Sequence, residues 1–107
     1  MDLTQLTQAE EHLRRAREGL TVAAQLLHAV ADLISDHQPE QPISTMALGL
    51  AFSAAGADIL APYPRAVRDH ALLKALAVEP ITDQDVIAQG ITGGEYALRL
   101  RQAARTV

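Results

Sequence analysis

Residues 44–61, STMALGLAFSAAGADILA, decide the fold, because they carry one charged side chain and are otherwise small or apolar almost throughout. A helix that is apolar on all sides belongs in a protein core or in a membrane. This stretch is shorter than the roughly 20 apolar residues that span a bilayer. With Asp58 near its end, it predicts a buried central helix of a helical bundle. The four-residue spacing of Gly49, Ser53 and Ala57 predicts a face that another helix approaches closely.

The residues before this stretch predict one long first helix. Thr7 and Glu10 form a capping box, so we expect the helix to begin at Thr7 and to run to His37, ahead of Pro39. Gly19 lowers helix propensity by about 1 kcal/mol and marks the place where a bend could occur. We favour a continuous helix. Its apolar residues recur with heptad spacing, at Leu6, Ala9, Leu13, Ala16, Leu20, Ala23, Leu27, Val30 and Ile34.

The two halves of this first helix differ. A second apolar stripe begins in the later half, so that half must be enclosed by the bundle; the stripe consists of Val22, Leu26, Ala29 and Leu33. The earlier half is apolar on one face only, and charged side chains cover its other faces. A helix over residues 7–37 is about 45 Å long, whereas the central helix reaches only about 25 Å. The central helix therefore cannot cover the apolar seam along the earlier half of the first helix.

We expect this early seam to bind another protein, first of all a second copy of the chain as a homodimer. The predicted binding residues are the apolar seam and the arginine beside it, namely Leu6, Leu13, Ala16, Arg17 and Leu20. The alternative is a bend at Gly19 that lets the last helix cover the seam.

The remaining segments also predict helices. Pro62 and Pro64 force a turn, and a helix follows over residues 64–78. Thr82 then caps a short helix over residues 82–89, which Gly90 stops. A last helix, capped by Thr92 with Glu95, reaches Arg105. Because no stretch alternates as a strand does, we predict an all-α fold: a compact bundle of four to five helices in one domain over residues 1–107.

Composition restricts the function. The formal charge of −4 and the aromatic content of 3% argue against a nucleic-acid partner. The absence of cysteine excludes disulfides and thiolate zinc sites and fits a reducing compartment. The polar first twenty residues contain no apolar stretch of a secretory signal, so we expect a cytoplasmic protein with no membrane partner. His28, Asp32 and Asp36 share one strip of the first helix, but no second cluster completes a metal shell. We expect this strip to be a solvated face and the protein to need no metal or cofactor.

Arg65 and His70 stand five residues apart near the start of a predicted helix. This Arg-x4-His spacing resembles the active-site motif of HEPN-type ribonucleases. The resemblance implies that Arg65 and His70 act on the scissile phosphate of RNA. A guanidinium can stabilise phosphorane charge, and an imidazole can move protons near neutral pH. Ala66 departs from the family, which often carries a polar residue there.

Residues 82–105 resemble a helix-turn-helix, especially the recognition half of sigma-factor region 4. The resemblance implies that residues 90–92 form the turn and that the following helix reads DNA, with Arg99, Arg101 and Arg105 presented to it. Asp85 and Gln89 depart from the motif, which has apolar residues there.

The leading prediction is therefore a small non-enzymatic module for protein–protein interaction. A DNA-binding protein is the first alternative and a metal-independent ribonuclease is the second.

Overall fold

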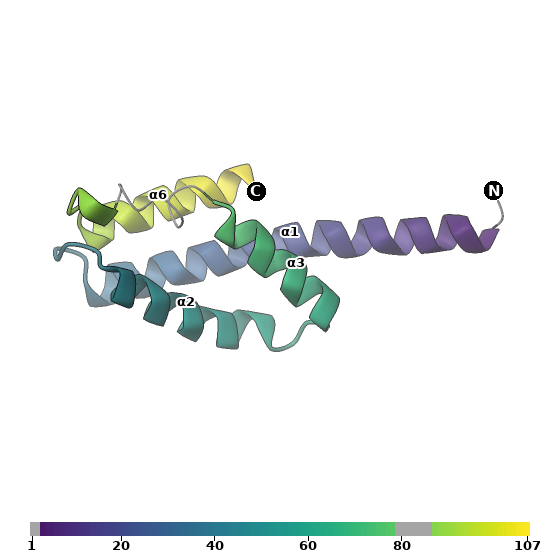
Figure 1. The fold of residues 1–107 in the computed structure, drawn as a ribbon, viewed down its shortest axis with the longest axis horizontal. Coiled ribbons are helices and arrows are strands. Elements are labelled where there is room, and N and C mark those ends of the chain that lie inside the picture. The colour runs from purple at the N-terminus through teal and green to yellow at the C-terminus, as the bar shows by residue number, and fades with distance from the viewer. Residues whose placement is uncertain (1–2, 79–86) are drawn as a thin grey trace.

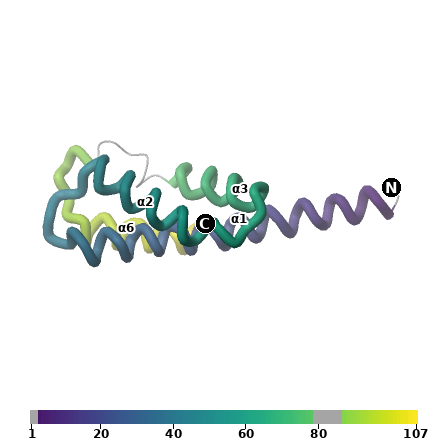
Figure 2. Tube along the Cα trace, turned by 90° about the horizontal axis from the view of Figure 1, so that it is seen from below, coloured from purple at the N-terminus to yellow at the C-terminus, as the bar shows by residue number. Residues whose placement is uncertain are grey.

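The computed structural model describes residues 3–78 and 87–107, and this part of the chain is a helical bundle (Figure 1). The described residues form four helices: α1 (Leu3–His37), α2 (Thr45–Leu60), α3 (Arg65–Leu76) and α6 (Gly93–Thr106). Figures 1 and 2 show α2 and α6 running back along the later half of α1, while α3 crosses α1 obliquely. Within these residues an isolated bridge between Pro42 and Thr92 is the nearest approach to a strand. The predicted all-α fold is confirmed.

The core is built around α1, because α2, α3 and α6 each pack against it. Every turn of its later half contributes buried side chains, as the double apolar stripe predicted. They are Val22, Ala23, Leu26, Leu27, Val30, Ala31 and Ile34. From the other helices come Val67 and Ala71 of α3 and Tyr96 and Leu100 of α6.

The prediction that the helix over residues 44–61 is the buried centre is wrong. Only Leu48, Ala55 and Leu60 of α2 are buried, whereas Met46 is 76% exposed and Leu50 66% exposed. This helix packs on α1 by one face, and among the described residues no helix covers its outer face. Much of that outer face is Ala, Gly and Ser, which carry little apolar area, so leaving it in water costs little.

The predicted site of close helix approach is also wrong. Gly49, Ser53 and Ala57 are exposed, and a Cβ added at Gly49 would meet nothing within 4 Å. The close approaches are at two other glycines. A side chain at Gly19 would overlap the ring of His70 in α3, and one at Gly93 would overlap the carbonyl oxygen of Gln38.

The first helix is continuous through Gly19, as favoured from its sequence. Gly19 is buried, and the His70 ring occupies the space beside it, so close packing offsets its low helix propensity. The predicted start at Thr7 is wrong, because the helix begins at Leu3. The Thr7 hydroxyl donates a hydrogen bond to the Leu3 carbonyl oxygen at 2.8 Å, as a threonine inside a helix can.

The later helix boundaries agree closely with the sequence. The third helix follows Pro64 and ends at Leu76, two residues before the predicted end. Most of the predicted short helix over residues 82–89 lies outside the described residues. Gly90 has a φ of 71°, the left-handed conformation typical of a helix stop. The Thr92 hydroxyl accepts a hydrogen bond from the Glu95 backbone N–H at 3.2 Å, which confirms that cap.

The molecule is elongated, with principal extents of 57 × 24 × 18 Å. Its radius of gyration of 15.8 Å exceeds the roughly 13 Å of a compact domain of this length. The early half of α1 causes the difference, because it projects beyond the other helices (Figures 1 and 2). We call residues 3–18 the arm, since the first buried residue of α1 is Gly19, and we call the rest of the described molecule the body.

Within the described residues, no helix is both long enough and apolar enough to cross a membrane.

Candidate protein-binding surface

The predicted binding seam lies along the arm and is open to solvent. Leu6 is 45% exposed and Leu13 is 55% exposed, while Ala16 and Leu20 are half-buried where the arm meets the body. Arg17 is exposed beside them. Figures 1 and 2 show that the early part of α1, towards the N-terminus, extends past α2, α3 and α6. The alternative, in which α1 bends and the last helix covers the seam, is therefore wrong.

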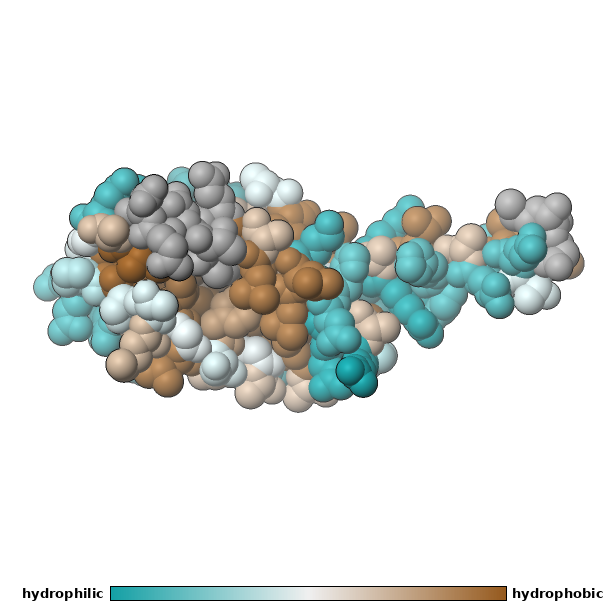
Figure 3. Space-filling model, in the orientation of Figure 1, coloured by the Kyte–Doolittle hydropathy of each residue, from teal (hydrophilic) through white to brown (hydrophobic). Residues whose placement is uncertain are grey.

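Charged side chains on the opposite face of the arm pair with one another and leave the seam apolar. Glu11 accepts hydrogen bonds from Arg14 at 2.5 Å and from Arg15 at 3.2 Å. The hydrogen bond from Arg14 chiefly holds the pKa of Glu11 below its usual value, and Arg15 adds to this effect. The same pair raises the pKa of Arg14. In the view of Figure 3 the arm is mainly hydrophilic, beside a more apolar body.

The body ends sharply at Gly19. His70 of α3 lies directly on this glycine and is half-buried there. From Val22 onward the heptad positions of α1 are covered, and Ala23 and Leu27 are fully buried. The free length of the seam is therefore set by where α3 reaches α1.

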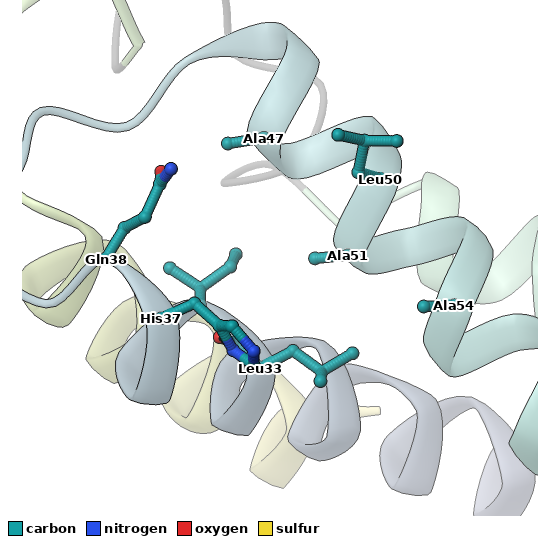
Figure 4. Close-up of a pocket in the computed structure, with 8 residues that line it drawn as sticks. Leu33, His37, Gln38, Ala47, Leu50, Ala51 and Ala54 are labelled. Carbon is teal, nitrogen blue, oxygen red and sulfur yellow. The ribbon is translucent and has the colours of Figure 1, made fainter.

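A second apolar feature lies between α1 and α2, where a pocket of about 270 Å³ opens to the surface (Figure 4). Three alanines of α2, Ala47, Ala51 and Ala54, line one wall, and their short side chains leave the space opposite Leu33 unfilled. Sequence reasoning missed this pocket because it expected α2 to be enclosed. The alanine spacing was the signal available.

His37 lines the same pocket near the end of α1. Its Nδ1 donates a hydrogen bond to the Leu33 carbonyl oxygen at 2.9 Å. This bond directs one polar atom of the ring to the backbone of α1. The other residues that line the pocket are mostly apolar.

The structure separates the two residues of the ribonuclease hypothesis. The Arg65 side chain is 87% exposed and forms an ion pair with Asp69 at 3.6 Å. His70 instead packs against Gly19 of α1. Residues five apart on a helix point about 140° away from each other, so the two side chains occupy different sides of α3.

The arginines of the DNA-binding hypothesis lie on α6, whose other face is buried on α1 through Tyr96 and Leu100. The Arg101 guanidinium donates a hydrogen bond to Asp32 of α1 at 2.8 Å, and Arg99 pairs with Glu95 at 3.5 Å. Arg105 is exposed. Two of the three arginines are thus paired with carboxylates of the chain itself, and the motif's first helix lies mostly outside the described residues.

The strip of His28, Asp32 and Asp36 is exposed along α1, as expected of a solvated face. Asp32 is taken up by its ion pair with Arg101. Across residues 3–78 and 87–107, no group of three histidine, cysteine or carboxylate side chains is placed to hold a metal ion.

Comparison with protein-family models, with curated proteins and with solved structures finds no match for this chain.

Proposed function

We propose that the protein is a non-enzymatic helical module that binds another protein through the apolar seam of its arm. The observation that carries the proposal is the exposure of Leu6 and Leu13 on a helix that continues without a break out of a packed body. Binding there would bury large apolar side chains, each contributing roughly 1.5–3 kcal/mol. The expected compartment is the cytoplasm, which the absence of cysteine favours.

The continuity of α1 supports this proposal on energetic grounds. An isolated helix as short as the arm is only marginally stable in water, because helix nucleation is unfavourable. In this protein the buried half of α1 supplies the nucleus, and the arm extends it. A helix that is already formed loses little conformational entropy when it binds, so more of the burial energy remains for affinity. Partner recognition by one apolar helix face then follows the usual helix-in-groove or coiled-coil geometry.

Leu13→Asp tests this proposal, because it places a charge in the middle of the seam. We expect the variant to keep its far-UV circular dichroism spectrum and its unfolding midpoint, since Leu13 contacts no packed core. Association should be lost, measured as self-association by sedimentation equilibrium and as partner capture by affinity purification from the source organism.

Gln8→Asp is the matched control. It adds the same charge to an exposed position on the opposite face of the arm, and we expect it to bind as the unmodified protein does. Equal binding by all three proteins would overturn the proposal, as would unfolding of the domain by Leu13→Asp.

A further inference from the structure

We propose that the arm binds the arm of a second copy of this chain, antiparallel, with the twofold axis passing beside residue 11. This inference rests on the proposed function, and it adds the identity of the partner, the orientation and the register. Three observations carry it: the order of large and small residues along the seam, the point at which the body covers α1, and the position of the body at one end of the arm.

The seam is self-complementary in one orientation only. Leucine occupies one heptad position, at Leu6, Leu13 and Leu20, and alanine occupies the other, at Ala9 and Ala16. In a parallel pair each position faces its own copy, so layers of leucine against leucine alternate with underfilled layers of alanine against alanine. In an antiparallel pair the two positions face each other, so the layers that contain Leu6, Ala9, Leu13 and Ala16 each set one leucine against one alanine. Alternating large and small side chains is how facing helices fill the space between them.

Burial selects the register. With the axis beside residue 11, Leu6 faces Ala16 of the second copy and Ala9 faces Leu13 of the second copy. A shift of one heptad towards the body would set Leu6 against Ala23, which is already fully buried. A shift of one heptad the other way would leave Leu13 and Ala16 uncovered. The central register alone covers Leu6, Ala9, Leu13 and Ala16 without displacing packed residues, and Leu20, which is half-buried where the arm meets the body, lies just beyond these layers.

The shape of the molecule permits this pairing. Residues 3–19 would overlap over about 25 Å, which is the whole free length of the arm. Because the body lies at one end of each arm, the two bodies come to lie at opposite ends of the pair (Figure 1). A contact of one helix on another is small for a protein interface, so the dimer is reversible and not obligate. The axis also brings the two copies of Glu10 near each other, which weakens the pair modestly.

The absence of cysteine allows a direct test by single-site spin labelling. Thr4→Cys and Gln25→Cys place one label each on exposed positions of α1, one near the tip of the arm and one in the body. Antiparallel helices separate equivalent residues along the axis by about 3 Å for each residue of distance from the twofold axis. We therefore expect interlabel distances of about 21 Å for Thr4→Cys and about 42 Å for Gln25→Cys, plus the width of the pair, in pulsed dipolar measurements. Adding Leu13→Asp to either variant should raise the dimer dissociation constant at least about a hundredfold and remove the dipolar signal.

The other outcomes separate this inference from the proposed function. Short distances at both sites would show a parallel dimer and overturn the antiparallel register. A monomer with no dipolar signal, whose arm still captures a different protein in a Leu13-dependent manner, would overturn the second copy as partner and leave the proposed function standing. A monomer that captures no protein would overturn both.

Discussion

The two halves of α1 carry the same apolar heptad seam, yet one half is core and the other is surface. Leu13 and Leu27 occupy the same heptad position two heptads apart, but Leu13 is 55% exposed and Leu27 is fully buried. The difference lies in what surrounds the repeat. The later half has a second apolar stripe, at positions such as Val22 and Leu26, and three helices pack against α1. The half of α1 with one apolar seam is left uncovered by the other helices, whereas the half with a second apolar stripe is enclosed by helices of the same chain.

Truncating the two equivalent leucines should have very different effects on stability. We expect Leu27→Ala to lower the free energy of unfolding by about 2–5 kcal/mol, because it opens a cavity in the packed body. Leu13→Ala removes the same atoms from the arm and should lower the free energy of unfolding of the monomer by less than about 1 kcal/mol. Urea denaturation of dilute protein, followed by circular dichroism, measures both values. Similar losses at the two positions would mean that the arm is part of the core.

A second pair of variants tests which glycines of the body lie in close contact with neighbouring segments. Gly93→Ala adds a methyl group that overlaps the Gln38 carbonyl oxygen, and backbone on both sides prevents an easy adjustment. We expect the free energy of unfolding to fall by about 1–3 kcal/mol, as overpacking does.

Gly49→Ala is the control for this substitution, because the added methyl group points into open space on α2. Better helix propensity should raise the free energy of unfolding by up to about 1 kcal/mol. Thermal unfolding compares the two variants. A loss at Gly49 as large as that at Gly93 would show that the outer face of α2 is covered after all.

The local features of this fold were predictable from the sequence, whereas the choice of central helix was not. The enclosed half of α1 followed from its two stripes, and the start of α6 followed from Thr92 and Glu95. These depend on neighbours in sequence. Which helix is central depends on which faces other helices cover, and a helix such as α2, rich in alanine and glycine, has no distinct apolar face to indicate this.

The exposure of the candidate binding surface was also predictable from the sequence. The exposed seam followed from a comparison of helix lengths, since a helix of about 25 Å cannot cover a longer one. The pocket beside Leu33 was missed because it depends on the distance between α1 and α2. The spacing of three alanines in α2 was a signal, but it does not tell which helix lies opposite them. Close contacts between residues far apart in sequence, such as the contact of His70 with Gly19, could not be predicted from local sequence patterns either.

The smallest expected effect concerns the arm alone and depends on pH. The hydrogen bond from Arg14, with a contribution from Arg15, holds the pKa of Glu11 below its usual value in the folded arm. A carboxylate with a lowered pKa stabilises the helix above the usual carboxyl pKa, and this stabilisation is lost as the pH falls through the lowered value. Acidification through that range should therefore fray the arm before it affects the body. Cα chemical shifts of residues 8–15 should move towards coil values while those of residues 22–34 stay unchanged.

Glu11→Gln provides the matched control, because it keeps a hydrogen-bonding side chain and removes the titrating charge. Its arm should already be slightly less helical at neutral pH, and the part of the pH response that Glu11 causes should disappear. Every other side chain of the arm is the same in both proteins, so the difference between the two titrations isolates Glu11. If the arm and body residues moved together on acidification, or if Glu11→Gln left the response unaltered, the ion pair would not stabilise the arm. The seam would then depend only on the buried half of α1 for its helical structure.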